Sequence, residues 1–188
     1  TEEEKAQFLE IVHSNNELLQ QLIADILDLS KIEAGTLEFT FSEVDVNQLM
    51  FDIEQLFRMR LEDKSAVIQI IRQTPPDECV MYTDRNRLQQ VVSNFMTNAV
   101  KFTDEGSITF GYNRCAEGLY FYVKDTGSGI PEDKVNHIFE RFVRVEQNKK
   151  GTGLGLAICE MIIRKLGGKI GVELSLIHIS EPTRHSLI

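Results

Sequence analysis

Three polar side chains recur on one predicted helix at steps that place them on a common face. Asn94, Asn98 and Lys101 stand four and three residues apart within residues 84–102, so at about 100° per residue they fall within a narrow arc. Amide oxygens are neutral hard ligands and an ammonium group attracts anions, so this face suits a magnesium–phosphate group. A solvated polar edge has the same spacing, and the helix taken alone favours that interpretation.

Two glycine-rich segments follow this helix. The run DTGSGI at 125–130 comes after a predicted strand, where the Asp carboxylate can accept a hydrogen bond from an amino group and the glycines allow the backbone to approach a flat ring. The run GTGLGL at 151–156 opens the last long predicted helix, where unpaired N–H groups and the helix dipole favour phosphate. Neither run matches the GxxxxGK[ST] phosphate loop or a dinucleotide-binding turn. Asp and Gly are also common in plain turns.

The segment between the two glycine runs, residues 131–150, is mostly polar. Phe139 and Phe142 are suited to anchor a mobile lid over a bound anion. The lid's positive charge would come from Arg141, Arg144, Lys149 and Lys150.

The elements that position these groups can be predicted from periodicity. Apolar residues recur at heptad spacing over residues 3–33, and Gly35 is placed to end that helix. This seam favours packing into a helical bundle, and the alternative is a helix folded onto its own domain. The remaining pattern predicts strands at 37–41, 67–71, 80–82, 108–112 and 119–123, the last two as an antiparallel hairpin, and helices at 46–61, 84–102 and 154–166. We therefore expect an α+β fold, with a mixed sheet and helices on one face.

Composition excludes several classes of protein. Of the formal net charge of −9, the whole excess lies in residues 1–45, and neither part of the chain has the basic stripe of a nucleic-acid binder. No apolar run approaches the roughly 18 residues of a membrane span, which predicts a soluble, cytoplasmic portion. Three widely spaced cysteines give no zinc or disulfide pattern.

Taken in order, the motifs resemble those of sensor histidine kinases, bacterial two-component proteins that are often hybrid. Residues 94–103 (NFMTNAVKFT) are similar to the N box, 125–130 to the first glycine box, 139–142 (FERF) to the F box, and 151–156 to the second glycine box. The run DLSKIEAG at 28–35 resembles the end of the second helix of that family's dimerisation hairpin.

This resemblance implies a domain organisation. Residues 1–35 would be the second helix of a dimerisation hairpin, and residues 36–173 a Bergerat-type ATP-binding α/β sandwich. Residues 174–188 are an unmatched tail, in which SLIHISEPTR at 175–184 looks like adaptor read-through. If the family's closing strand is absent there, the sheet loses a member and stability.

The resemblance also implies ATP and Mg²⁺ as cofactors. Asn98 would be the main magnesium ligand with Asn94 assisting, Lys101 would reach the phosphates, and Asp125 would accept from the adenine amino group. The other expected nucleotide contacts are Gly127, Gly129, Ile130, Arg141, Arg144, Gly151, Thr152, Gly153, Leu154 and Gly155.

One position separates kinase from hydrolase on chemical grounds. Hydrolytic members of this fold place a Glu general base four residues before the magnesium-binding Asn, and this chain has Asn94 there. An amide cannot take a proton from water, whereas a neutral His acceptor already presents a lone pair. A protein-histidine kinase is therefore favoured over an ATPase.

The family's phosphoacceptor histidine is not found in its usual context. His13 is followed by Ser14-Asn15-Asn16, on what resembles the second hairpin helix, and we interpret it as an ordinary helical residue. The chain is thus expected to transfer the ATP γ-phosphate to a His supplied by another polypeptide; the alternative is a non-catalytic nucleotide-sensing or dimerisation module. Expected partners are a second copy, through the N-terminal helix of the parent protein, and a response regulator receiver domain. Nucleic acid is not expected, and a membrane only through further parts of the parent.

Overall fold

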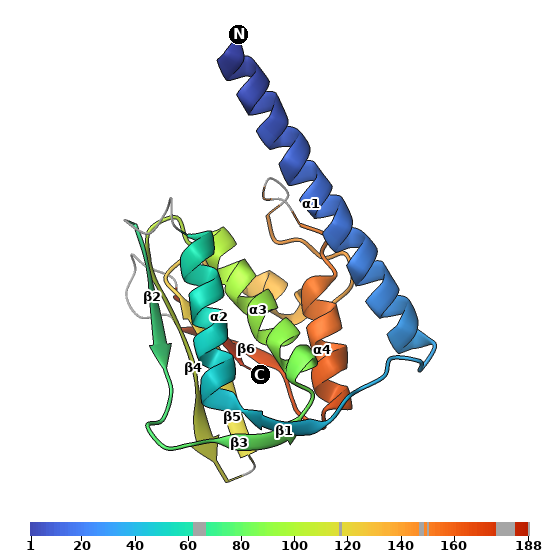
Figure 1. Ribbon diagram of the computed structural model, residues 1–188, viewed down its shortest axis with the longest axis vertical. Helices are drawn as coiled ribbons and strands as arrows, with labels where there is room; N and C mark the ends of the chain where they lie inside the picture. Colours follow the sequence, from blue (N-terminus) through green and yellow to red (C-terminus); the bar gives the residue numbers. More distant parts are fainter. Residues whose placement is uncertain (62–66, 117, 147–148, 150, 176–182, 188) are drawn as a thin grey trace.

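Figure 1 shows the computed structural model as a layered domain from which one long helix projects. The structure describes residues 1–61, 67–116, 118–146, 149, 151–175 and 183–187. None of the helices in these ranges combines the length and apolar character needed to cross a membrane.

The domain is built on a mixed five-stranded sheet of order β2-β4-β5-β7-β6. β2 and β4 run parallel, and the other neighbouring pairs are antiparallel. A separate two-stranded sheet joins β1 to β3. The strands are β1 Ser42–Asp45, β2 Ile68–Gln73, β3 Val80–Thr83, β4 Gly106–Cys115, β5 Gly118–Asp125, β6 Gly171–Ser175 and β7 Thr183–Leu187.

Helices cover one face of this sheet, which confirms the expected α+β class. Figure 1 shows α2, α3 and α4 side by side in front of the strands, with α3 packed against β4 and β5 and α2 against β2. The helices are α1 Glu2–Glu33, α2 Val46–Arg60, α3 Arg85–Phe102, the 3₁₀ turn η2 Glu132–His137, and α4 Gly155–Lys165.

The core forms because helix and strand periods bury apolar side chains on facing surfaces. On α3, Leu88, Val92 and Phe95 are buried at helical spacing, and on β4 Ile108 and Phe110 are buried at alternate positions. The same helical period leaves the polar residues of α3 beside this apolar stripe. The predicted helices at 46–61, 84–102 and 154–166 and the hairpin at 108–123 are confirmed.

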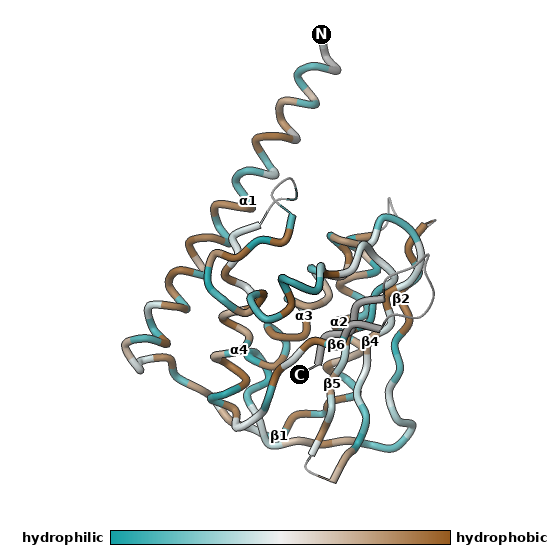
Figure 2. The backbone as a smooth tube through the Cα atoms, turned by 180° about the vertical axis from the view of Figure 1, so that it is seen from behind, coloured by the Kyte–Doolittle hydropathy of each residue, from teal (hydrophilic) through white to brown (hydrophobic). Residues whose placement is uncertain are grey.

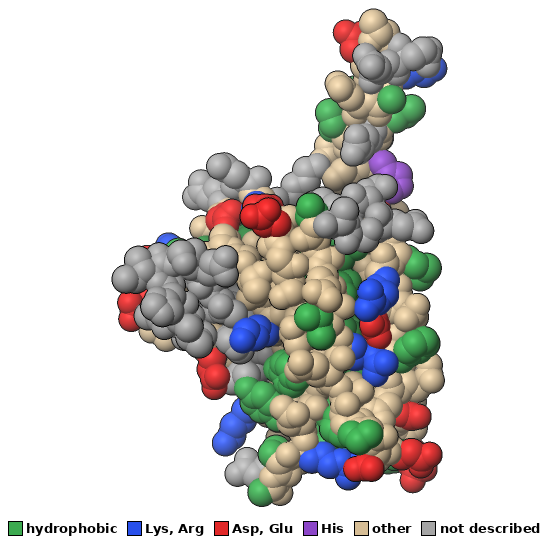
Figure 3. All heavy atoms as spheres, turned by 90° about the vertical axis from the view of Figure 1, so that its left-hand side faces the viewer, with side chains coloured by type: hydrophobic (Ala, Val, Ile, Leu, Met, Phe, Trp, Pro, Cys, Tyr) green, Lys and Arg blue, Asp and Glu red, His purple; other side chains and the backbone are tan. Residues whose placement is uncertain are grey.

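α1 packs on the domain through its C-terminal half only. Asp25 and Leu29 are buried there, and Ile32 packs against the core. This half of α1 therefore has the arrangement given above as the alternative to bundle packing, a helix folded onto its own domain. The apolar seam stays exposed toward the N-terminus, at residues including Phe8 and Leu19. Figure 2 shows that hydrophobic residues recur along this projecting part, and Figure 3 shows apolar side chains on its surface.

The C-terminal end of α1 has the geometry expected of a glycine cap. Gly35 has φ +67°, and its N–H donates to the Ile32 carbonyl while Thr36 N–H donates to the Lys31 carbonyl. These two hydrogen bonds form a Schellman motif, which favours Gly because the residue after the C-cap must adopt a positive φ. The helix therefore stops where the sequence predicts.

The strand predicted at 37–41 is wrong, because the first strand begins only at Ser42. β1 pairs with β3 from Ser42 opposite Thr83 onward. The alternation of Phe39 and Phe41 instead reflects stacking of their rings, at 6.2 Å between centroids, with Phe41 stacking in turn on Tyr82.

Asp84 secures the start of α3 and the chain before β1. Its Oδ1 accepts from Arg87 N–H at 3.0 Å and its Oδ2 from Thr40 N–H at 2.8 Å. Asp84→Ala should destabilise the fold by roughly 2–3 kcal/mol, because it removes a helix cap and leaves the Thr40 amide without this acceptor. Urea unfolding measures the change.

The matched control is Asp45→Ala, since exposed Asp45 caps α2 through Gln48 N–H alone. We expect about 1 kcal/mol for this variant. Equal losses for the two variants would contradict the second role of Asp84.

The C-terminal residues contribute a strand to the sheet. β7 lies between β5 and β6 and pairs with both, so the sheet does not lose that member. The assignment of residues 174–188 as a tail outside the domain stays a prediction.

Candidate functional site

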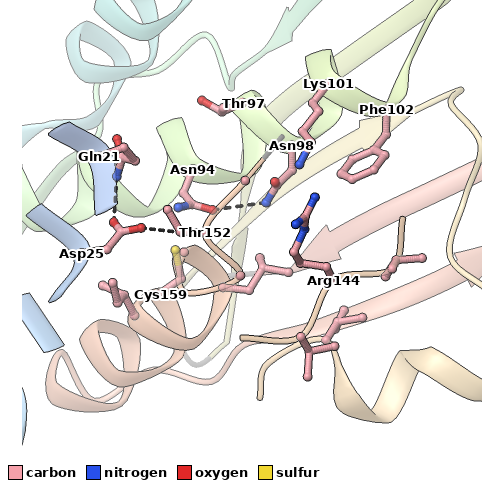
Figure 4. A pocket seen from close by; sticks show the side chains of 18 of the residues that line it. Gln21, Asp25, Asn94, Thr97, Asn98, Lys101, Phe102, Arg144, Thr152 and Cys159 are labelled. Atoms are coloured by element: carbon pink, nitrogen blue, oxygen red, sulfur yellow. Dashed lines mark hydrogen bonds between the residues drawn. The ribbon is translucent and has the colours of Figure 1, made fainter. Parts of the chain in front are cut away.

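A cavity lies between α3, the start of α4 and the C-terminal half of α1. Its volume is about 440 Å³. Residues 151–153 and part of the predicted lid complete its wall, and Figure 4 shows polar side chains from these separate segments directed into it.

The three polar residues of α3 meet in this cavity. Asn94, Asn98 and Lys101 all line it, and the Asn98 amide donates from Nδ2 to Asn94 Oδ1 at 3.2 Å. Lys101 Nζ lies 4.8 Å from the centroid of the Phe102 ring, a cation–π distance. The helical arc predicted from spacing therefore faces a cavity rather than open solvent.

The second glycine run packs directly on these side chains. A Cβ at Gly155 would lie 2.3 Å from Asn94 Nδ2, and one at Gly151 would lie 2.8 Å from Lys101 Nζ. Gly153 has φ +73°, and a Cβ there would approach the Phe142 backbone to 2.9 Å. Glycine is required most clearly at Gly153, where φ is positive and the close atoms are backbone, whereas a Cβ at Gly155 or Gly151 would displace the side chain of Asn94 or Lys101.

Positive charge gathers on one side of the cavity. Arg144 lines it with Lys101, and Figure 4 shows both side chains directed toward the same region. Arg144 Nη2 donates to the Lys149 carbonyl at 2.6 Å, and Lys149 Nζ donates to the Lys101 carbonyl at 2.9 Å. These contacts connect the lid to the C-terminal end of α3, and the cationic side chains of Lys101 and Arg144 would attract an anion to the cavity.

The lid backbone is fixed to the second glycine run. Phe142 N–H donates to the Gly153 carbonyl at 2.8 Å, and Phe142 itself has φ +63°. Arg141, in contrast, forms an ion pair with Glu33 at the end of α1 and does not line the cavity. Of the two predicted lid arginines, the structure brings Arg144 to the site and not Arg141.

The first glycine run lies beside the cavity and not in its wall. Asp125 is 2% exposed at the end of β5, and its Oδ1 accepts from Gly127 N–H at 3.0 Å. Ser128 N–H donates to the carbonyl of Phe102, which does line the cavity. The predicted residues outside the lining are Asp125, Gly127, Gly129, Ile130, Arg141 and Leu154.

Leu154 packs in the core and does not line the cavity. It is fully buried in the hydrophobic core and is the N-cap residue of α4. Of the predicted magnesium and phosphate contacts, the cavity brings together all but Arg141 and Leu154. The predicted adenine segment lies outside the lining, where Ser128 N–H donates to the Phe102 carbonyl.

α1 contributes cavity residues that the sequence analysis missed. Gln21 and Asp25 line the cavity, together with Cys159 of α4. Burial raises the pKa of the Cys159 thiol, and the nearby Asp25 carboxylate raises it further. A signal existed, because Asp25 shares the buried face of α1 with Leu22 and Leu29 at helical spacing. His13 lies elsewhere on α1, exposed and 3.6 Å from Glu17.

The donor set of the cavity fits Mg²⁺. Within the part of the chain that the structure describes, no cluster of three or more His, Cys, Asp or Glu side chains could hold a metal. The amide oxygens of Asn94 and Asn98 are hard, neutral ligands, which suit an ion that keeps several waters and shares phosphate oxygens.

Comparison with known proteins identifies one family over more than half of the chain. Residues 83–186 match the model of the histidine kinase-, DNA gyrase B- and HSP90-like ATPases. The sensor histidine kinase RcsC of Escherichia coli strain K12 is 36% identical over 166 residues, which cover 86% of this chain and 17% of RcsC. The chain thus spans about a sixth of that relative.

Solved structures show the same architecture. Full-length ShkA in complex with AMPPNP superposes with a TM-score of 0.80 and 29% identity, covering 98% of this chain and 38% of ShkA. Histidine kinase ThkA in complex with the response regulator TrrA gives 0.72 at 24% identity, covering 97% of this chain and 50% of ThkA; this likeness concerns the fold alone.

Proposed function

The chain belongs to the histidine kinase-, DNA gyrase B- and HSP90-like ATPase family, and from that premise we propose that it is the ATP-binding catalytic part of a sensor histidine kinase. It transfers the γ-phosphate of ATP to a His on a partner polypeptide. The observation that carries this proposal is the meeting of Asn94, Asn98 and Lys101 with the second glycine run in one cavity.

Each group in the cavity has a distinct task. Asn98 and Asn94 would hold Mg²⁺, which neutralises phosphate charge when bound. Lys101, Lys149 and Arg144 attract and orient the phosphates. N–H groups at Gly151–Gly155 bind phosphate oxygens at the start of α4, where the helix dipole favours negative charge.

Asp125 is the adenine-recognising residue in this proposal. Gly127 N–H donates to its Oδ1 and fixes the orientation of the carboxylate, which would accept from the adenine amino group. Gly127, Gly129 and Ile130 would lie against the ring, Thr152 and Leu154 would support the phosphate-binding loop, and Arg141 would join the lid contacts once released from Glu33.

Transfer to histidine is favoured over hydrolysis by the residue at position 94. Asn94 Oδ1 already accepts from Asn98, and an amide cannot serve as the general base that would activate water. The imidazole of an incoming His needs no such base.

The domain organisation and partners follow from the same proposal. Residues 1–35 form the second helix of a dimerisation hairpin, and residues 36–173 form the catalytic domain. The exposed apolar side chains of α1, among them Phe8 and Leu19, are the surface for a homodimer of the parent protein. A response regulator receiver domain is the final phosphate acceptor.

Asp125→Asn tests nucleotide recognition. Because Gly127 N–H retains the oxygen of the new amide, the NH₂ group would meet the adenine amino group, donor against donor. We expect a 10- to 100-fold loss of affinity for magnesium–ATP, measured by calorimetric titration of folded protein. Affinity for GTP, whose ring presents an acceptor there, should fall less.

The exposed carboxylate of Asp77 provides the control. Asp77→Asn removes the same charge at an exposed residue outside the cavity lining and should leave ATP affinity unchanged. Unaltered ATP binding by Asp125→Asn, or equal losses for ATP and GTP, would rule out the adenine contact.

Phosphotransfer separates the kinase from its alternatives. The folded chain is mixed with labelled ATP and a matching acceptor hairpin supplied in trans, and phosphohistidine is measured. ATP binding without phosphohistidine would leave a nucleotide-binding module, and steady phosphate release without the hairpin would indicate an ATPase.

A further inference from the structure

α1 inserts one carboxylate into the wall of the nucleotide cavity. Asp25 is 4% exposed and lines the cavity with Asn94 and Asn98. Figure 4 shows it between Gln21 and Thr152: its Oδ1 accepts from Gln21 Nε2 and its Oδ2 from Thr152 Oγ1, both at 2.7 Å. Both donors are neutral, so neither cancels the charge of the carboxylate.

The contact with Thr152 reaches the phosphate-binding end of α4. Thr152 Oγ1 also accepts from Leu154 N–H at 3.2 Å, and Leu154 is the N-cap residue of α4. Hydrogen bonds thus connect Asp25 through Thr152 to the helix N-terminus. The negative charge of α1 stands near the positive end of the α4 dipole, where a phosphate would also be stabilised.

We infer that Asp25 is an intramolecular anion that lowers the affinity of the cavity for phosphates while α1 is docked on the domain. Two anions near one helix terminus repel each other, and burial strengthens the repulsion because little water separates them. By thermodynamic reciprocity, a bound nucleotide weakens the docking of α1. The inference rests on the proposed function, since it takes ATP as the ligand.

Asp25→Asn isolates the charge. The amide has nearly the same size. Its oxygen accepts from Thr152, and its NH₂ donates to Gln21 when the Gln21 amide turns its oxygen inward, so the packing of α1 is retained. Calorimetric titration should show roughly tenfold tighter binding of magnesium–ATP, and a smaller gain for magnesium–ADP. Tripolyphosphate, which has no base, should gain as ATP does, and adenosine should gain nothing.

Asp28→Asn is the matched control on the same helix. Asp28 lies one turn further along, where it contacts Arg87 at 3.3 Å and Gln90 at 2.8 Å on α3, and it does not line the cavity. Loss of the Asp28 charge in this variant should change ATP affinity by less than about twofold. Equal gains in the two variants would mean that undocking or net charge is responsible, and would overturn the local role of Asp25.

The ligands separate this inference from the proposed function. If wild type binds ATP and Asp25→Asn binds it no more tightly, the inference is overturned and the proposed function stands. If neither protein binds ATP but tripolyphosphate affinity rises in Asp25→Asn, the antagonism stands and the nucleotide assignment fails. If folded protein binds none of the ligands, both are overturned.

Discussion

Asn98→Ala is expected to reduce the rate of phosphotransfer to an acceptor hairpin by roughly 100-fold or more, because it removes the principal oxygen ligand proposed for Mg²⁺. It also removes the donor that orients Asn94 Oδ1 at 3.2 Å. Both amides then lose their arrangement at the cavity. Labelled-phosphate transfer at saturating ATP measures the effect.

Magnesium removal shows whether the lost activity depends on the metal. Chelation should abolish transfer in wild type and add little to the defect of Asn98→Ala. Gln89→Ala, which deletes an amide from the same helix outside the cavity lining, should keep wild-type rates. Undiminished transfer by Asn98→Ala would remove this residue from the magnesium site.

Gly111→Ala is expected to cause the largest loss of stability, about 3–4 kcal/mol. Gly111 lies on β4 opposite Gln73 of β2, and a Cβ there would come within 1.8 Å of the Gln73 carbonyl oxygen. A backbone atom held in a sheet cannot move aside as a side-chain end can. β2 must therefore separate from β4, and chemical denaturation should show the loss.

Gly171→Ala is the control within the same sheet. A Cβ at Gly171 of β6 would meet no atom within 4 Å, and we expect a change within about 0.5 kcal/mol. Comparable stability of the two variants would contradict the close approach of β2 and β4 at Gly111.

The sequence predicted the site best where the period of a single helix sets the relative positions of the side chains. Asn94, Asn98 and Lys101 had to share an arc beside the apolar stripe once residues 84–102 formed a helix; only the structure shows that this arc faces a cavity. The second glycine run was likewise predictable, because it immediately precedes a helix start.

Other features depend on tertiary contacts that the local pattern does not contain. Phe39 and Phe41 alternate as strand residues do, yet their spacing serves ring stacking. Helical spacing places Asp25 on the same face of α1 as Leu22 and Leu29, but it does not show that this face meets the cavity. Nor could spacing show that Arg141 would pair with Glu33 and lie away from the cavity.

Asp84 joins the segment that leaves α1 to the start of α3 through two hydrogen bonds. The chain leaving α1 is tied at Thr40 to the first turn of α3, and Asp28 holds Arg87 in that same turn. α1 and the segment that follows it therefore share one attachment, the first turn of the helix that bears Asn94 and Asn98. A displacement of α1 relative to the domain would load that turn before any other part of α3.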